Sequence, residues 1–191
     1  MAREHMIESE QKRGMLLTIH PWQKQTEMDV FASYRRISRK TFVLPNGAEA
    51  EFEILQEPRC VSVLALTTRE TVLLVRQFRP GPEAILLELP GGGVSPGEDP
   101  AEAAARELLE ETGYRGEMEL AGSSWHCGYS TRRTYHFVAR SCVKIQEPTP
   151  DELEVLEVVE MPLADFKQHV RSSNLTDVAG AYMGLEKLNL L

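Results

Sequence analysis

Hydrophobic and polar residues alternate with a period of two near the start of the chain, which is typical of β-strands. From Ala48 to Leu55, small or apolar residues occupy every second position and glutamates stand between them, so one face of this strand meets a core. Pro45, Asn46 and Gly47 precede the strand, and an Asn-Gly pair tolerates the positive φ of a tight turn. Residues 34–55 are therefore predicted to form an antiparallel hairpin. We expect this hairpin to be part of a small N-terminal antiparallel sheet over residues 17–57, which follows a flexible N-terminal tail at residues 1–16.

Longer apolar runs, rich in β-branched residues, follow and predict buried central strands. The predicted strands lie at residues 60–67, 71–78, 135–143 and 154–161. Helical periodicity is found at residues 163–171 and 177–188. Because the strands and helices occur in mixed order, we expect an α/β fold in which a mixed sheet is covered by helices.

Composition and charge narrow the classes of partner. A chain of 191 residues suffices for about one domain and a small appendage, and its formal charge of −8 repels polyphosphate backbones, so we expect no nucleic-acid polymer as partner. It contains no apolar run of the roughly 18 residues that span a bilayer and no signal-peptide pattern, so we expect no membrane association and a cytoplasmic location. Three cysteines without CxxC spacing favour reduced thiols over disulfides or a zinc site.

One predicted helix carries a cluster of carboxylates. Asp99 before Pro100 is a helix start, and Gly113 is a stop. Within this helix Glu107, Glu110 and Glu111 fall close together beside the apolar face, although like charges at these spacings repel. Crowded carboxylate oxygens suit hard cations such as Mg²⁺ or Mn²⁺, whereas the alternative is an acidic face turned to solvent.

The spacing around this cluster favours the metal site. The motif residues are Gly92, Glu98, Arg106, Glu107, Leu108, Glu110, Glu111, Gly113 and Tyr114. They resemble the complete box of the Nudix hydrolases, G-x5-E-x7-R-E-U-x-E-E-x-G-U with U apolar, and only the last position departs, as an aromatic residue. The stretches RQFRP at 76–80 and ELPGG at 88–92 are similar to the branch that hydrolyses ADP-ribose and other nucleoside diphosphate sugars.

This resemblance implies a fold, an activity and a cofactor. The fold would be a Nudix-type α/β/α sandwich over residues 58–191, preceded by the small N-terminal sheet. The activity would be Mg²⁺-dependent cleavage of the phosphoanhydride of a nucleoside diphosphate sugar, with ADP-ribose as the expected substrate and Mn²⁺ as a substitute cation. In relatives the N-terminal sheet exchanges across a two-fold axis, so a homodimer is expected.

The resemblance also implies roles for residues of the box. Glu107 and Glu111 would be metal ligands, Glu110 a further ligand or a neighbour of the ligands, and the carbonyl of Gly91 would complete the site. Arg106 would orient the carboxylates, and Glu98 would lie in the loop beneath them.

The general base is expected outside the box, in an acidic loop at residues 151–162. Glu154 is the first choice and Glu152 the second, with Glu110 to be considered if neither is needed. The alternative for both loop residues is a solvated acidic loop.

Four further residues are candidates for substrate binding. Arg79 lies after a strand and before Pro80, where a guanidinium can take a phosphate in two hydrogen bonds, or else form a surface ion pair. Phe52 matches an aromatic that stacks a nucleobase in relatives, although its alternating position also fits a core residue, and Glu53 is its neighbour. The proline of a Pro-Gly-apolar-Ser turn is replaced by Cys127, and Tyr129 in this turn suits some dinucleoside polyphosphate hydrolases. That activity, and a Nudix-fold module that senses a nucleotide without turnover, remain the alternatives.

Overall fold

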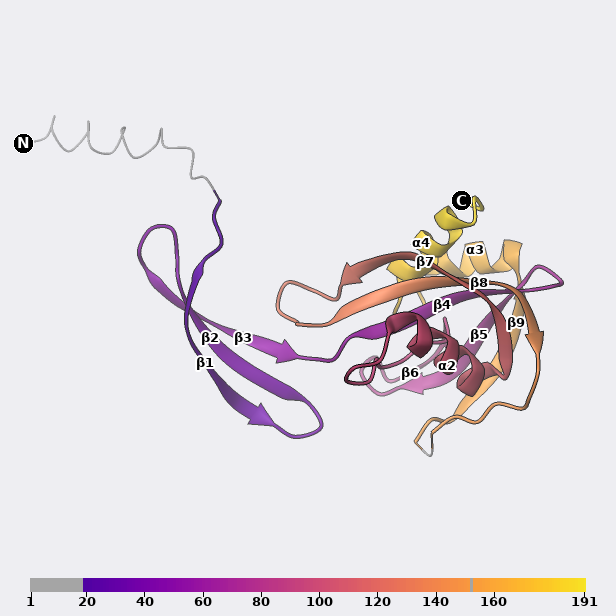
Figure 1. Ribbon diagram of the computed structural model, residues 1–191, viewed down its shortest axis with the longest axis horizontal. Coiled ribbons are helices and arrows are strands. Elements are labelled where there is room, and N and C mark those ends of the chain that lie inside the picture. Colours follow the sequence, from indigo (N-terminus) through magenta and orange to yellow (C-terminus); the bar gives the residue numbers. More distant parts are fainter. Residues whose placement is uncertain (1–18, 152) are drawn as a thin grey trace, which may run out of the picture. The chain divides into compact units, whose positions relative to one another are not determined.

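The computed structural model describes residues 19–151 and 153–191, which form two compact units (Figure 1). The described part of residues 1–56 is one unit, and residues 57–191 are the other. The acidic-loop residue Glu152 and the predicted tail at residues 1–16 lie outside the described residues.

The N-terminal unit is a three-stranded antiparallel meander. Its strands are β1 (Gln23–Ala32), β2 (Arg36–Val43) and β3 (Glu49–Gln56), in the order β1-β2-β3. The β2–β3 pair is the hairpin that the alternating pattern predicts, and Asn46 Oδ1 accepts a hydrogen bond from the N–H of Ala48 in its turn. Strand β1 was not predicted individually, because its polar residues follow no clear period, and all ten of its residues are exposed.

The second unit is built on a six-stranded mixed sheet. Its strands are β4 (Cys60–Thr67), β5 (Thr71–Arg79), β6 (Ala84–Glu88), β7 (Tyr114–Trp125), β8 (Arg133–Lys144) and β9 (Leu156–Pro162). The order is β6-β5-β4-β8-β7, with β9 paired to β5. Strands β4 and β8 run parallel, and the other pairs are antiparallel.

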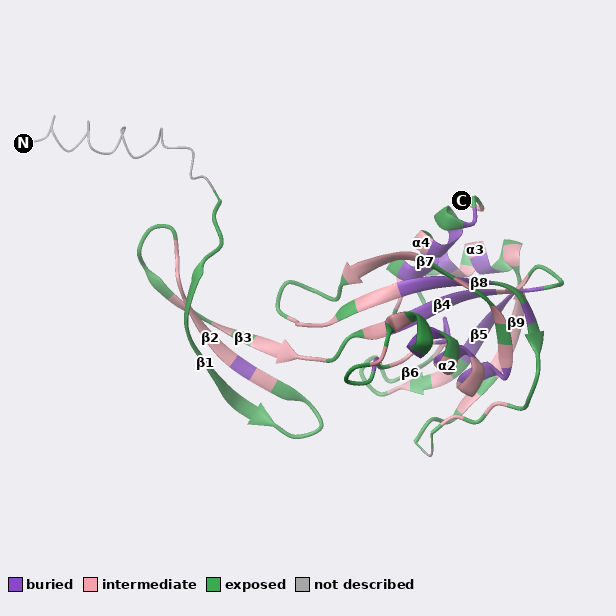
Figure 2. Ribbon diagram, in the orientation of Figure 1, coloured by how far each residue is buried: buried purple, intermediate pink, exposed green. Residues whose placement is uncertain are grey.

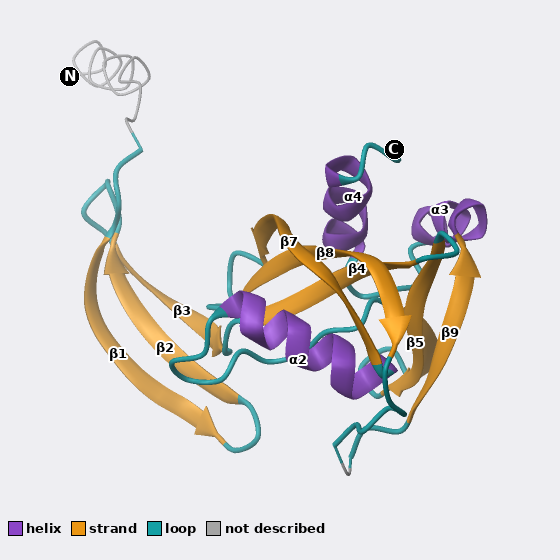
Figure 3. Cartoon of the chain, turned by 45° about the vertical axis from the view of Figure 1, so that its right-hand side comes forward, coloured by secondary structure: helices purple, strands orange, loops and turns teal. Residues whose placement is uncertain are grey.

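Three helices cover the two faces of this sheet (Figure 3). Helix α2 (Pro100–Thr112) packs on one face through a core that includes Ala104, Leu108 and Phe137. Helices α3 (Leu163–Ser172) and α4 (Val178–Lys187) pack on the other face, around Phe166 and Leu185. Figure 2 shows the buried residues concentrated along β4, β5 and β8, between the helical layers. The predicted α/β fold, a mixed sheet between helices with a small antiparallel sheet before it, is confirmed.

Individual elements differ from their predicted bounds. The strand expected at 154–161 begins at Leu156, so Glu154 lies in the preceding loop. Strands β6 and β7 were missed, because β6 has only five residues and β7 mixes glycines and charged residues with few buried side chains. As predicted, Cys60, Cys127 and Cys142 are free thiols.

The strands that pair with β5, and the glycine loop that follows β6, form the part of the fold in which the site lies. Strand β9 pairs with residues 71–77 of β5, so β4 and β6 share the other edge of that strand, β4 at residues 72–73 and β6 at residues 75–79. The chain leaving β6 returns to β4, where the N–H of Val61 donates to Gly92 O and the N–H of Val63 donates to Pro90 O, both at 2.9 Å. This glycine loop is thereby held against the sheet.

Within residues 19–151 and 153–191, no helix combines the length and the apolar character required to cross a bilayer.

Candidate active site

Helix α2 is delimited by local signals in its sequence. Asp99 caps its start, with Oδ1 accepting a hydrogen bond from the N–H of Ala101 at 2.8 Å, and Pro100 occupies the first turn, where its missing N–H costs nothing. Gly113 ends the helix at φ 77°, and a Cβ there would lie 2.2 Å from Gln146 O, so only glycine fits. The apolar face of α2 packs on the sheet, and this sets the direction of the glutamates beside it.

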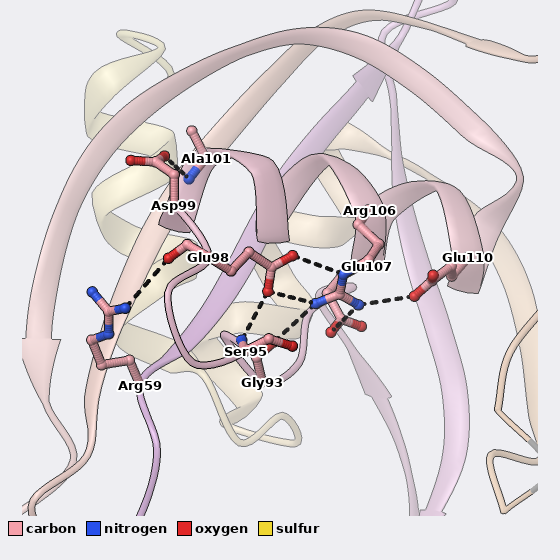
Figure 4. Close-up of polar contacts among 9 residues, drawn as sticks. All are labelled: Arg59, Gly93, Ser95, Glu98, Asp99, Ala101, Arg106, Glu107 and Glu110. Carbon is pink, nitrogen blue, oxygen red and sulfur yellow. Dashed lines mark hydrogen bonds and ion pairs between the residues drawn. The ribbon is translucent and has the colours of Figure 1, made fainter.

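Arg106 binds three carboxylates of the motif (Figure 4). Its Nε donates to Glu98 Oε1 at 2.9 Å, and its Nη1 donates to Glu107 Oε1 and Glu110 Oε2, each at 2.9 Å. Its Nη2 donates to the carbonyl of Gly93 at 3.0 Å. One planar guanidinium therefore fixes the relative positions of the helix and the loop before it.

Glu98 is held as a carboxylate by this contact. The hydrogen bond from Arg106 lowers the pKa of Glu98 to about 2, with a further contribution from the N–H of Ser95, which donates to Glu98 Oε2 at 2.8 Å. In turn, the carboxylates raise the pKa of Arg106. Glu98 thus lies in the loop before α2, where its side chain contacts Arg106 and the N–H of Ser95.

Two glutamates of α2 are buried. Glu107 is 8% exposed and Glu111 is 3% exposed. Burial raises the pKa of Glu107, and burial raises the pKa of Glu111 to about 8, although the N–H of Gly91 opposes the latter shift. The charges of Glu107 and Glu154 act on Glu111 in the same direction as burial, and that of Arg79 acts against it. Glu107, Glu154 and Arg79 therefore each lie close enough to Glu111 to affect its pKa.

The glycine loop closes against these carboxylates. The N–H of Gly91 donates to Glu111 Oε2 at 2.8 Å. A Cβ on Gly92 would lie 2.5 Å from the Glu107 carboxylate, and a Cβ on Gly91 would lie 2.2 Å from Val61 O. Glycine at both positions allows backbone and carboxylate to approach more closely than any other residue would.

This donor set fits a hard divalent cation. Oxygen ligands on one rigid helix, crowded beside a backbone loop without side chains, are the ligands that Mg²⁺ and Mn²⁺ prefer. Burial disfavours the charged forms of these two carboxylates, and a bound cation would stabilise those forms. Among the described residues, no three His, Cys, Asp or Glu side chains are already grouped as a metal cage. Arg106 binds one oxygen each of Glu107 and Glu110, and the N–H of Gly91 binds one oxygen of Glu111.

Arg79 lies at the end of β5 and forms an ion pair. Its Nε contacts Glu88 Oε2 at 2.5 Å, and the Arg79 side chain is 39% exposed. Glu88 is buried and was not among the predicted site residues. The signal available in the sequence was a single glutamate at the end of the apolar stretch AILLE, immediately before the glycine loop.

The acidic loop contributes Glu154, which is exposed. Its N–H donates to Asp151 O at 2.8 Å, and its Oε2 accepts from the N–H of Asp151 at 3.3 Å, so a turn holds it ahead of β9. Its charge raises the pKa of both Glu107 and Glu111, which places it near the buried carboxylates.

The remaining candidates belong to other elements of the chain. Phe52 and Glu53 belong to the N-terminal unit, where the Phe52 ring packs 5.6 Å from Trp22 and Glu53 Oε1 accepts from Arg39 at 3.1 Å. Phe52 is only partly buried, so its burial does not decide between a core residue and an aromatic that stacks a nucleobase. Tyr129 is 61% exposed, in the loop between β7 and β8. Their substrate contacts stay predictions.

The chain is similar to several known proteins. The chain is 34% identical over 142 residues to the ADP-ribose pyrophosphatase of Bacillus subtilis (strain 168), covering 73% of this chain and 77% of the relative. It is 31% identical over 180 residues to the ADP-sugar pyrophosphatase of Mus musculus, covering 85% and 76%. The crystal structure of an ADP compounds hydrolase has the same fold, with a TM-score of 0.75 at 21% identity over 91% of this chain and 99% of that one. The NUDIX domain family model matches residues 57–177, so the chain belongs to the NUDIX family, as its motif predicted.

Proposed function

We propose that this protein is a Mg²⁺-dependent pyrophosphatase that cleaves nucleoside diphosphate sugars, with ADP-ribose as the first substrate. The observation that carries the proposal is the pair of buried glutamates, Glu107 and Glu111, packed against a glycine loop with Arg79 and Glu154 nearby. A module that only binds a nucleotide need not retain such a cluster of carboxylates, which repel one another.

The residues that would hold the cation are Glu107, Glu110, Glu111 and the carbonyl of Gly91. When bound there, Mg²⁺ supplies positive charge that neutralises diphosphate oxygens, a function that Mn²⁺ can also serve. Arg106 keeps Glu107 and Glu110 in place through Nη1, so the carboxylates need no rearrangement of the helix to act.

The other groups act on the substrate and on water. Arg79 binds a phosphate of the diphosphate through its guanidinium and thereby orients the phosphoanhydride. Glu154 takes a proton from the attacking water, whose oxygen bonds to one phosphorus while the bridging P–O bond breaks. The products are a nucleoside monophosphate and a sugar phosphate.

The names of relatives support this choice of substrate. Two of the relatives that align with most of this chain are an ADP-ribose pyrophosphatase and an ADP-sugar pyrophosphatase. Both names describe the same bond in the same class of molecule. We therefore propose that the substrate is a small nucleoside diphosphate derivative.

A substrate panel tests the proposal. The full chain is incubated with ADP-ribose, other nucleoside diphosphate sugars and diadenosine polyphosphates, with Mg²⁺, with Mn²⁺ or with EDTA, and the products are identified by chromatography. We expect AMP and ribose 5-phosphate from ADP-ribose, and no turnover in EDTA. Preference for the diadenosine compounds would instead favour the dinucleoside polyphosphate activity, and binding without turnover would favour a sensing module.

We further propose that the protein is a homodimer formed through its N-terminal sheet. Strand β1 leaves Met28, Val30 and Phe31 between 41% and 61% exposed, which is an apolar surface that a three-stranded sheet cannot cover by itself. A second copy of the same sheet is the partner with matching chemistry. Sedimentation equilibrium of the full chain measures the expected dimer directly.

A further inference from the structure

Glu88 is a buried carboxylate to which three segments of the chain contribute. It is 2% exposed and ends strand β6. Its Oε2 accepts from Nε of Arg79, at the end of β5. Its Oε1 accepts from the N–H of Thr176 at 3.2 Å and from the Thr176 hydroxyl, in the segment between α3 and α4. Each oxygen of Glu88 therefore has a partner, as a buried carboxylate requires.

The register of β5 and β6 determines how the Arg79 side chain reaches Glu88. Arg79 pairs with Ala84 and Glu88 pairs with Val75, so the two residues stand at different levels of the same strand pair. Side chains on alternate residues share a face, so Arg79 lies on the face of Val75 and Glu88. The Arg79 side chain must extend back along the strands to reach Glu88, rather than outward into solvent.

This conformation leaves the rest of the guanidinium available. Its Nε is bound to Glu88, and among the described residues neither Nη1 nor Nη2 of Arg79 forms a hydrogen bond. Glu88, which binds this Nε, stands immediately before the loop whose Gly91 N–H donates to Glu111 Oε2, so the guanidinium lies beside the carboxylate site. Two parallel N–H donors on one guanidinium match two oxygens of a phosphate.

Thr176 is itself held in a defined position. The next residue, Asp177, caps helix α4, with Oδ1 accepting from the N–H of Gly180 at 3.1 Å. Asp177 Oδ2 lies 3.4 Å from Nδ1 of His136, which is fully buried in β8. The helical layer behind the sheet therefore fixes the Thr176 donors that hold Glu88 Oε1.

We propose that Glu88 and Thr176 form a positioning clamp that holds the Arg79 guanidinium with its Nη edge toward the diphosphate of the substrate. This inference deepens the proposed function, on which it rests. Without the clamp, Arg79 would sample many rotamers and would lose that freedom on binding, which weakens the interaction. Glu88 acts through Arg79 and does not itself touch the substrate.

A double-mutant cycle tests the clamp. Glu88→Gln keeps the shape but removes the charge that holds Nε, so KM for ADP-ribose is expected to rise by about tenfold while kcat changes by less than about threefold. Arg79→Ala is expected to raise KM at least as much, and the double variant no further, because both changes remove one interaction. Thr176→Val should raise KM in the same direction, and Thr176→Ser, which restores the hydroxyl, should return it toward the wild-type value.

The matched control is Glu157→Gln. Glu157, in β9, pairs at 2.5 Å with Arg76, which lies in β5 as Arg79 does, but both side chains of this pair are more than half exposed. The same chemical change at this pair should leave KM unaltered. If Glu88→Gln raises KM equally in the wild type and in Arg79→Ala, Glu88 supports the fold rather than Arg79, and the clamp is refuted. A lower KM in Glu88→Gln would also refute it, since Glu88 would then compete with phosphate for Arg79.

Two measurements separate the clamp from the proposed activity. The Nε–H signal of Arg79 in a ¹⁵N NMR spectrum should be protected from solvent exchange in the wild type and lost in Glu88→Gln, whatever the protein hydrolyses. Calorimetry with methylenediphosphonate and Mg²⁺ measures diphosphate binding without turnover. If the wild type cleaves no diphosphate, the proposed function fails. The clamp then stands only if Glu88→Gln weakens this binding in the wild type but not in Arg79→Ala, and it falls if Glu88→Gln weakens binding equally in both.

Discussion

Glu111 Oε2 accepts a hydrogen bond from the N–H of Gly91 at 2.8 Å, which joins the last turn of α2 to the loop that follows β6. The contact links residues 20 positions apart. It holds the Glu111 carboxylate, which is 3% exposed, against the backbone of a glycine, which has no side chain. Glu111 is therefore positioned by the fold before any ligand binds, which is the condition for a low reorganisation cost in catalysis.

Glu111→Gln is expected to keep the fold and to lower kcat by at least about a hundredfold, because it removes a charged ligand that a divalent cation needs. The amide oxygen can still accept the hydrogen bond from Gly91, so the thermal midpoint should change little. Steady-state kinetics at saturating Mg²⁺ measure the effect. Glu102→Gln, on the exposed first turn of the same helix, is the control, and near-normal turnover in Glu111→Gln would contradict the metal assignment.

Arg79→Ala is expected to raise KM for the diphosphate substrate by roughly tenfold or more, since a charge-assisted hydrogen bond of about 1.5 to 3 kcal/mol is lost. Arg76→Ala on the same strand, whose side chain pairs with Glu157 at the surface, should leave KM near the wild-type value. Initial rates over a range of substrate concentrations distinguish the two variants. Equal effects of both would mean that Arg79 has no special contact with the substrate.

Glu154→Gln is expected to lower kcat by roughly two to four decades and to leave the affinity for substrate and Mg²⁺ nearly unchanged, since it removes the proton acceptor for water. Hydroxide can replace a missing base, so the activity of this variant should recover steadily as pH rises. Glu152→Gln is the matched variant from the same loop and should do much less. A reversed order of the two effects would assign the base to Glu152, and two active variants would direct attention to Glu110.

Glu98 should make the stability of the protein depend on pH in the acid range. Its pKa is lowered from 4.5 to about 2 by Arg106, so its contribution is fully present above pH 4.5 and is lost as pH falls toward 2. Glu98→Gln lacks this contribution at every pH. Urea unfolding at several pH values should therefore show the two proteins converging as pH decreases, whereas a constant difference in their free energies of unfolding would contradict the assignment.

Met28→Glu is expected to shift the proposed homodimer toward monomer, because it puts charge into the exposed apolar surface of β1, where Met28 is 61% exposed. Sedimentation velocity at several protein concentrations measures the change. Glu49→Gln, at an exposed position of β3, is the control and should leave the sedimentation coefficient unaltered. A wild-type protein that stays monomeric at all concentrations would reject the dimer.

The sequence by itself determined helix α2 and the spacing of its carboxylates. The cap at Asp99, the stop at Gly113 and the contact between Arg106 and Glu110 depend on residues at most four positions apart, so a local pattern suffices to predict them. The β2–β3 hairpin was predictable for the same reason, because its turn chemistry and its alternation are both local.

Only the tertiary structure decided which carboxylates are buried and which side chains contact them. Glu88 and Thr176 are 88 positions apart, and Arg79 reaches Glu88 only because β5 and β6 pair in a register that puts both on one face. Likewise, Glu154 comes near Glu111 because β9 pairs with β5 rather than because of any local pattern. Burial and the pKa values that depend on it arise from the summed packing of distant segments, and a single sequence contains no local signal for that sum.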